Sequence, residues 1–118
     1  ALKTTLPKFG AVIIDTWNNE PDVDKELIEM VDVATPHIAG YSADGKVNAD
    51  NMVIDALCRH FHLEHPGKIM PPSLPSDFPY TGSPLELYNP LNDSQALKAN
   101  PSKFEYLRNH YPLRREYF

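Results

Sequence analysis

The segment Ala11–Tyr41 restricts the fold of this chain more than any other, because two short apolar runs flank a stretch with helical spacing. The first run, Ala11–Ile14, is continuous, which is typical of a strand covered on both faces of a parallel sheet. The second run, Val31–Ala34, is weaker because Asp32 interrupts it. Between the runs, the apolar positions of Val23–Met30 recur at helical spacing. The segment therefore predicts a strand, a helix and a strand of an α/β fold.

Three polar residues follow the two predicted strands. Asp15 comes where the first strand ends, Glu20 lies further along the same loop, and His37 follows the second strand. Taken singly, each has an ordinary explanation: a turn former or helix cap, a loop residue before proline, and a surface histidine. Ligands of open α/β sheets gather at the carboxyl ends of the strands, where these side chains would converge. Together they predict a site for proton transfer at neutral pH.

The residues around this predicted site match the pattern of a known family. The run AVIIDTWNNEP at 11–21, followed by TPHIAGY at 35–41, closely resembles the end of the nucleotide-binding domain of D-isomer-specific 2-hydroxyacid dehydrogenases. The run GYSADGK at 40–46 and the pattern FxxLRxxYxxRRE at 104–116 resemble members of that family whose substrate is phosphorylated. The first resemblance covers residues 1–63, whereas the proline-rich middle of the chain matches poorly.

The resemblance implies a role for five residues. His37 matches the histidine that exchanges a proton with the substrate oxygen, and Glu20 matches the carboxylate that pairs with it. Asp15 matches the residue that binds the carboxamide of the nicotinamide ring, and Gly40 matches a backbone position beside the cofactor. Tyr41 matches a residue that contacts the phosphorylated substrate. We expect these residues to form the catalytic, cofactor-binding and substrate-binding parts of one site, with no metal.

The same resemblance implies an architecture and a reaction. Residues 1–43 would end an NAD-binding, Rossmann-like, doubly wound domain, 44–64 would form a crossover helix, and 65–118 would be a linker and part of a helical dimerisation region. The implied enzyme is a cytoplasmic homodimer that oxidises 4-phospho-D-erythronate with NAD in pyridoxal 5′-phosphate biosynthesis. An enzyme of the same family acting on glycerate or phosphoglycerate is one alternative. A non-catalytic dimerisation module is another, motivated by the Phe104, Leu107 and Tyr111 stripe and the proline-rich segment.

Composition limits the other classes of function. A formal net charge of −5 argues against a non-specific nucleic-acid binder, and no apolar run approaches the length of a membrane span. With Cys58 as the one cysteine, an internal disulfide is impossible and a reducing cytoplasm is expected. The opening residues, ahead of Pro7–Gly10, resemble the end of a helix, and Glu116–Phe118 resemble the start of another element. We therefore expect a piece of a longer protein. The family resemblance implies that its glycine-rich dinucleotide loop and its substrate-binding arginine lie upstream.

The rest of the chain predicts three helices around an irregular connector. Asp44–Leu63 has the clearest helical stripe, with Ser42 or Asp44 as its N-cap, and residues 66–84 are rich in proline. Two further helices are expected at Asn92–Ala99 and Pro101–Tyr111. Their expected caps are Asn92 or Asp93 for the first and Asn100 for the second.

Two groups of charged or titratable residues have the chemistry for ligand binding. His60 and His62 would point to different faces of a helix, so that these residues and His65 are interpreted as solvated histidines and not as metal ligands. Three arginines, Arg108, Arg114 and Arg115, could hold a phosphate or an acidic partner, or could be solvated charges.

Overall fold

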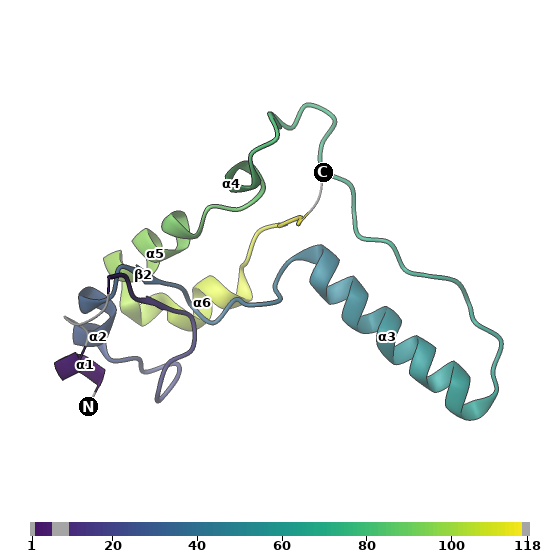
Figure 1. Ribbon diagram of the computed structural model, residues 1–118, viewed down its shortest axis with the longest axis horizontal. Helices are drawn as coiled ribbons and strands as arrows, with labels where there is room; N and C mark the ends of the chain where they lie inside the picture. The colour runs from purple at the N-terminus through teal and green to yellow at the C-terminus, as the bar shows by residue number, and fades with distance from the viewer. Residues whose placement is uncertain (1, 6–9, 117–118) are drawn as a thin grey trace. The chain divides into compact units, whose positions relative to one another are not determined.

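The computed structural model describes residues 2–5 and 10–116, which form an α/β arrangement of two parallel strands and several helices (Figure 1). The expected helix stop at Pro7–Gly10 and the expected element at Glu116–Phe118 lie largely outside the described residues. In chain order the elements are α1 (Leu2–Thr5), β1 (Ile13–Ile14), α2 (Lys25–Met30), β2 (Val33–Ala34), α3 (Ala43–Phe61), α4 (Pro84–Leu87), α5 (Pro90–Ala99), η2 (Pro101–Lys103) and α6 (Phe104–Asn109).

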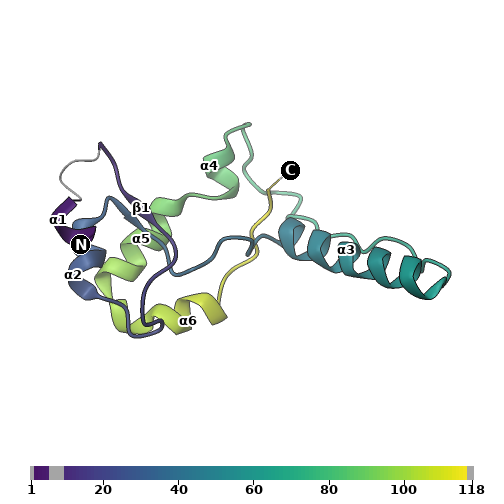
Figure 2. The same ribbon diagram turned by 60° about the horizontal axis from the view of Figure 1, so that its bottom comes forward.

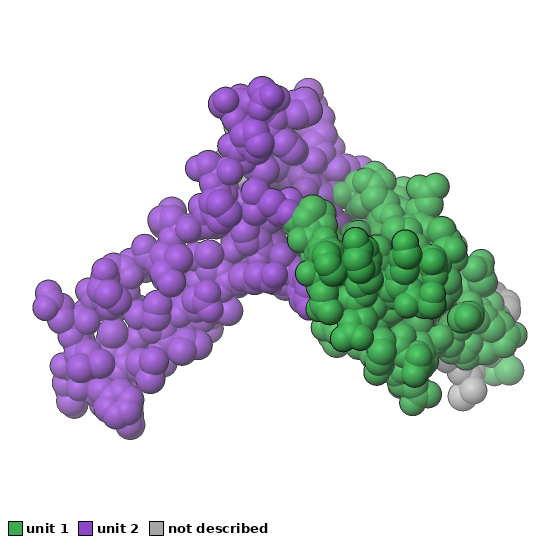
Figure 3. Space-filling model, turned by 180° about the vertical axis from the view of Figure 1, so that it is seen from behind, with its two compact units in different colours: residues 1–39, 89–112 green, residues 40–88, 113–118 purple. Residues whose placement is uncertain are grey.

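The chain divides into two compact units, which Figure 3 shows in different colours. The first unit comprises Ala1–Ala39 and Asn89–Pro112, and holds the sheet with α2, α5 and α6. The second unit comprises Gly40–Tyr88 and Leu113–Phe118, and holds α3 and α4. The domain boundaries expected from the sequence stay predictions.

The predicted strand–helix–strand unit is present, with shorter strands than expected. β1 and β2 pair in parallel, with Ile13 opposite Val33 and Ile14 opposite Ala34. Because successive side chains of a strand point to opposite faces, Ile14 packs against the core while Ile13 is 70% exposed. The expectation that the first strand is covered on both faces is therefore wrong for these residues, since the apolar core lies on one face.

Helix α5 covers the buried face of the sheet and lies beside the strands in both ribbon views (Figures 1 and 2). The Ser94 hydroxyl accepts a hydrogen bond from the Ala34 amide at 3.0 Å, and the Lys98 ammonium donates to the Val31 carbonyl. These contacts satisfy polar backbone groups in β2 and in the residues just before it. The buried apolar side chains of this unit form one core: Trp17, Val23, Ile28, Val31, Ala34, Leu97 and Phe104.

The apolar stripe of the last helix belongs to this core. Phe104 is 1% exposed, and Leu107 packs against the same cluster. The Tyr111 hydroxyl donates to the Asp93 carboxylate at 2.9 Å. Of the two sequence interpretations of this stripe, core or interface with another subunit, the structure supports the core. One of the two features that motivated a non-catalytic dimerisation module is therefore removed, and the proline-rich segment is the other.

The predicted caps have different outcomes: Ser42 caps its helix, Asn100 stands at the cap position of η2 without a side-chain capping hydrogen bond, and the cap of α5 differs. Asp24 caps α2 by accepting from the Leu27 amide, and Ser42 caps α3 by accepting from the Gly45 amide. Helix α5 begins earlier than expected, because Asn89 caps it and Pro90 takes the first helical position. The prediction of Asn92 or Asp93 as its cap is wrong.

Helix α3 confirms the predicted helix to within two residues at each end. It has no buried residue in this chain, and the side chains of Met52, Val53, Leu57 and Phe61 are largely exposed. Of the described residues, 63–83 contain no helix or strand, as their prolines predict. Asn51 holds this connector to α3, since its amide group exchanges two 2.9 Å hydrogen bonds with the backbone of Ile69.

Candidate active site

Glu20 and His37 meet in the first unit, one from the loop after β1 and the other from the turn after β2. The Nδ1 atom of His37 lies 2.7 Å from Oε2 of Glu20. The other carboxylate oxygen, Oε1, accepts a hydrogen bond of 2.7 Å from the Trp17 amide. Because a carboxylate only accepts hydrogen bonds, Nδ1 carries the proton in this pair, and the other ring nitrogen, Nε2, is left for a substrate.

The surroundings of Glu20 keep its carboxylate ionised at neutral pH. Burial acts to raise the pKa of Glu20, but the hydrogen bonds from His37 and Trp17 outweigh it. The positive charges of His37 and Arg108 act in the same direction, so that the pKa lies below its ordinary value. Glu20 is therefore suited to orient the imidazole ring and to stabilise it when it takes up a proton.

The backbone of His37 adopts a left-handed conformation, with φ of 54°. This region is uncommon for residues other than glycine and costs on the order of 1–3 kcal/mol unless the surrounding structure imposes it. Here the Ile38 amide donates to Oδ1 of Asp15 at 2.8 Å, and the His37 carbonyl accepts from Nε of Arg108 at 3.2 Å. The peptide group that follows His37 is thus held on both sides, which fixes the direction of the ring.

Asp15 ties the end of the first strand to the turn that carries His37. Its Oδ1 accepts from the Thr35 hydroxyl at 2.7 Å and from the Ile38 amide, and its Oδ2 accepts from the Ala39 amide at 3.0 Å. Burial acts to raise the pKa of Asp15, yet these hydrogen bonds and the nearby His37 lower it below the ordinary value. Oδ2 keeps acceptor capacity beyond its one hydrogen bond, so that a further amide donor can bind there.

Trp17 connects the two loops of the site to the core. Its indole Nε1 donates to the Thr35 carbonyl at 2.9 Å, and its ring is buried in the core. Sequence reasoning did not identify Thr35, whose hydroxyl and carbonyl bind Asp15 and Trp17. A threonine directly after the second strand and before Pro36 was the signal that could have indicated this role.

The other two predicted site residues open the second unit. Gly40 has φ of 76°, a left-handed conformation that favours glycine, as its place in the turn predicts. Tyr41 lies beside the first turns of α3, where Nζ of Lys46 is 4.7 Å from the centroid of its ring. The structure thus brings Asp15, Glu20 and His37 together in one unit, and describes Gly40 and Tyr41 in the other.

Comparisons with known proteins extend this picture over most of the chain. A protein of Bacteroides fragilis named erythronate-4-phosphate dehydrogenase is 53% identical over 108 residues, which is 88% of this chain and 31% of that relative. Relatives of the same name from Bacteroides thetaiotaomicron and Porphyromonas gingivalis are 49% and 40% identical, over 88% and 90% of this chain. This chain is homologous to a part of the erythronate-4-phosphate dehydrogenases.

The homology confirms the family resemblance that the sequence motifs indicated. The chain spans about a third of the length of the erythronate-4-phosphate dehydrogenases that it matches, at 31% and 32%. No protein-family model matches it. The homologous stretch contains the Glu20–His37 pair, and the name of the relatives is that of a dehydrogenase.

The arginines within the pattern at 104–116 make defined contacts in this homologue of the erythronate-4-phosphate dehydrogenases. Arg108 binds the His37 carbonyl, and Arg115 binds both carboxylate oxygens of Asp44. The guanidinium of Arg114 lies 4.2 Å from the centroid of the Tyr88 ring. The interpretation of this group as solvated charges is wrong for Arg108 and Arg115, whose contacts are structural.

The three histidines near the end of α3 also have separate neighbours. His65 lies 2.8 Å from the Asp55 carboxylate and accepts from the Gly67 amide, and the His60 ring packs edge-on against Phe61. Among residues 2–5 and 10–116, no three side chains of histidine, cysteine, aspartate or glutamate are placed to hold one metal ion. Within the same residues, no helix has the length and apolar character needed to cross a membrane.

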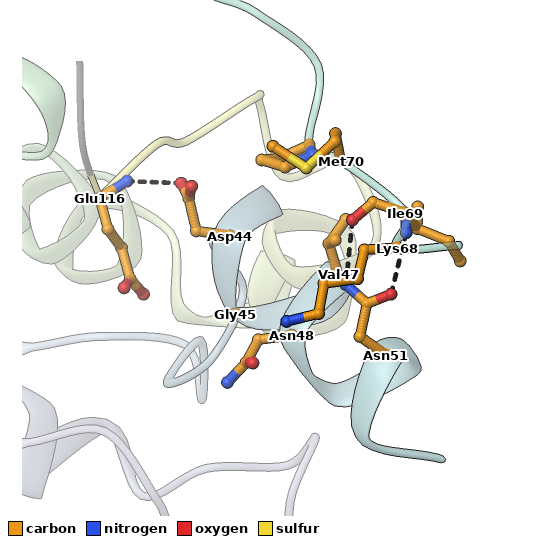
Figure 4. Close-up of a pocket in the computed structure, with 10 residues that line it drawn as sticks. Asp44, Gly45, Val47, Asn48, Asn51, Lys68, Ile69, Met70 and Glu116 are labelled. Carbon is orange, nitrogen blue, oxygen red and sulfur yellow. Dashed lines mark hydrogen bonds between the residues drawn. The ribbon is translucent and has the colours of Figure 1, made fainter. Parts of the chain in front are cut away.

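A pocket of about 420 Å³ lies beside the first half of α3 (Figure 4). None of the five predicted site residues lines it. Its lining residues are Asp44, Gly45, Val47, Asn48, Asn51, Lys68, Ile69, Met70, Pro71 and Glu116. Asn51 and Asp44 already bind the connector and the C-terminal segment, so that the polar lining is largely occupied by contacts within the chain.

Proposed function

We propose that this chain is part of an enzyme that oxidises 4-phospho-D-erythronate to (R)-3-hydroxy-2-oxo-4-phosphooxybutanoate with NAD. The observation that carries the proposal is the 2.7 Å contact between Glu20 and His37, in a chain homologous to erythronate-4-phosphate dehydrogenases. An imidazole oriented by a carboxylate is a common proton acceptor at neutral pH. The reaction would serve pyridoxal 5′-phosphate biosynthesis, in the cytoplasm.

In this mechanism His37 removes the proton of the substrate hydroxyl. Its Nδ1 proton stays on the Glu20 side, so that Nε2 receives the substrate proton while the carbon loses a hydride. Glu20 stays ionised and stabilises the imidazolium that forms, without accepting the proton itself. The left-handed backbone of His37, held by Asp15 and Arg108, keeps the ring from turning away between binding and reaction.

NAD, when bound, supplies the acceptor for the hydride. The residues described here fit its nicotinamide end, because the ionised Asp15 carboxylate keeps acceptor capacity on Oδ2 that suits a carboxamide N–H. Gly40 fits the close approach of a cofactor, since no atom lies within 4 Å of where a Cβ would stand. These are the two residues that we assign to the cofactor, as part of a Rossmann-like, doubly wound domain.

Tyr41 is the residue that we assign to the phosphorylated end of the substrate. The ammonium of Lys46 beside its ring gives this position a positive charge, which favours an anionic group over a neutral one. We also propose that the full-length enzyme works as a homodimer. The 118 residues alone are expected to be inactive, because they contain no glycine-rich dinucleotide loop.

The experiment that tests the proposal is an assay of NAD reduction by the full-length protein with 4-phospho-D-erythronate. His37→Asn should abolish turnover, and Tyr41→Phe should weaken binding of the phosphorylated substrate while leaving turnover on saturating substrate. Faster turnover of glycerate or phosphoglycerate would agree with the proposed enzyme family but would contradict 4-phospho-D-erythronate as the substrate. Absence of activity on every hydroxy acid would contradict the enzyme.

A further inference from the structure

The segment 114–116 is hydrogen-bonded to residues 42–44 at the start of α3, and we refer to this set of contacts as the C-terminal clamp. The Ala43 amide donates to the Arg114 carbonyl at 2.8 Å. The Glu116 amide donates to Asp44 at 2.8 Å, as Figure 4 shows. The Ser42 hydroxyl donates to the Glu116 carboxylate at 2.6 Å. Both segments belong to the second unit, and more than 70 residues separate them in the sequence.

The ion pair within the clamp is bidentate and shielded from solvent. Arg115 donates from Nε and Nη2 to the two oxygens of Asp44, at 2.8 and 3.0 Å, and from Nη1 to the Pro72 carbonyl at 2.6 Å. The side chains of Arg115 and Asp44 are 15% and 13% exposed. The hydrogen bonds from Arg115 hold the pKa of Asp44 below its usual range. Such paired, directional contacts fix geometry better than an exposed ion pair does.

The clamp acts on the residues at either side of Tyr41. Ser42 is fully buried, and its hydroxyl accepts from the Gly45 amide at 2.9 Å while donating to Glu116. A Cβ on Gly45 would lie 2.9 Å from that hydroxyl and 3.2 Å from the Gly40 carbonyl. The backbone carbonyl before Tyr41 and the Ser42 side chain after it therefore both pack against one glycine. The Ser42 hydroxyl in this packing is held by Glu116.

We propose that Ser42 and Glu116 are positioning residues for Tyr41, and that through it they set the affinity for the phosphorylated substrate. The proposal rests on the proposed function, in which Tyr41 contacts that substrate. Loss of the Glu116 carboxylate frees the Ser42 hydroxyl to turn, and the peptide that carries Tyr41 loses its fixed direction. Glu116 touches neither substrate nor cofactor in this account.

The test compares Glu116→Ala with Glu105→Ala in the full-length protein, since Glu105 is an exposed glutamate on α6. Losing one charge-assisted hydrogen bond should raise KM for 4-phospho-D-erythronate roughly tenfold and change kcat less than about twofold. Glu116→Gln, whose amide oxygen can still accept from Ser42, should recover most of the affinity. Adding Glu116→Ala to Tyr41→Phe should raise KM no further, because the positioned hydroxyl is already absent.

Three results would overturn the proposal. If the wild type is active and Glu116→Ala keeps the KM of Glu105→Ala, the clamp does not position Tyr41, and the proposed function stands. If Glu116→Ala lowers kcat and thermal stability as much in the Tyr41→Phe background as in the wild-type background, the clamp only stabilises the fold. If the wild type does not oxidise the phosphorylated substrate, the proposed function and this inference fail together.

Discussion

Arg108 donates a hydrogen bond from Nε to the backbone carbonyl of His37, 3.2 Å away, while the ring of His37 contacts Glu20. A side chain from α6 thus holds the backbone of the histidine, although the two residues are 71 apart in the sequence. The same guanidinium contributes to the lowered pKa of Glu20. Arg108 therefore acts on both members of the pair.

Replacing Arg108 by methionine should slow the proposed reaction and leave the fold intact. The change removes a charged hydrogen bond, so that kcat should fall about tenfold while KM for NAD changes little. Steady-state kinetics on the full-length protein would measure this. Arg59→Met is the matched control, because Arg59 is exposed on α3 and its Nε donates to the Asp55 carbonyl of its own helix. An equal effect of both variants would contradict the role of Arg108.

Replacing Glu20 by glutamine should reduce kcat by roughly 10²-fold, since the neutral amide no longer orients and stabilises the imidazolium. The change should also alter how the free energy of unfolding depends on pH under acidic conditions. The pKa of Glu20 is lowered on folding from an ordinary 4.5, so that its contribution is present above that pH and is lost as the pH falls through the folded pKa. Unfolding measured between pH 6 and about 3 should therefore lose less stability in Glu20→Gln than in the wild type.

Replacing Arg115 by lysine should open the C-terminal clamp locally. Lysine keeps the charge but cannot make the two parallel contacts with Asp44. Amide hydrogen exchange at Ala43 and Glu116, whose N–H groups donate within the clamp, should accelerate roughly tenfold. The pKa of Asp44 in the folded protein lies below its ordinary 3.8. Acid should therefore produce the same opening in the wild type as the pH falls through that lowered pKa. Unchanged exchange in Arg115→Lys would mean that the backbone contacts suffice.

Replacing Gly45 by alanine should stabilise α3 but disturb the geometry of the residues around Tyr41. Alanine in a helix interior is favoured over glycine by about 0.5–1 kcal/mol, so that α3 by itself should gain stability. The added Cβ would displace the Ser42 hydroxyl and press on the Gly40 carbonyl, so that KM for the phosphorylated substrate should rise. Asn48→Ala, one turn later on an exposed position of α3, should gain propensity without raising KM.

Local patterns in the sequence were sufficient for part of the fold and for the convergence of Glu20 and His37. The strand–helix–strand order, α3, and the meeting of Glu20 with His37 all follow from short-range spacing and strand ends. The same patterns overstated the strands, because a run of apolar residues does not tell how many neighbouring strands exist. Ile13 is exposed for this reason.

Contacts between distant segments could not be derived in the same way. The Ser94 hydroxyl on the Ala34 amide joins residues 60 apart, and Arg115 on Asp44 joins residues 71 apart. Periodicity placed Phe104 on an apolar stripe, but it could not say whether that stripe faces the core of its own unit or another surface. Such choices depend on how helices pack in three dimensions, which a one-dimensional pattern does not contain.

Trp17 is the one tryptophan of the chain, and it is bonded to both loops of the candidate site. Its amide holds Glu20, its indole holds the Thr35 carbonyl, and its ring is buried in the core. Any rearrangement of the Glu20 loop or of the turn after β2 would change the polarity around the indole. The ultraviolet emission of the unlabelled protein is therefore an intrinsic optical probe of these two loops.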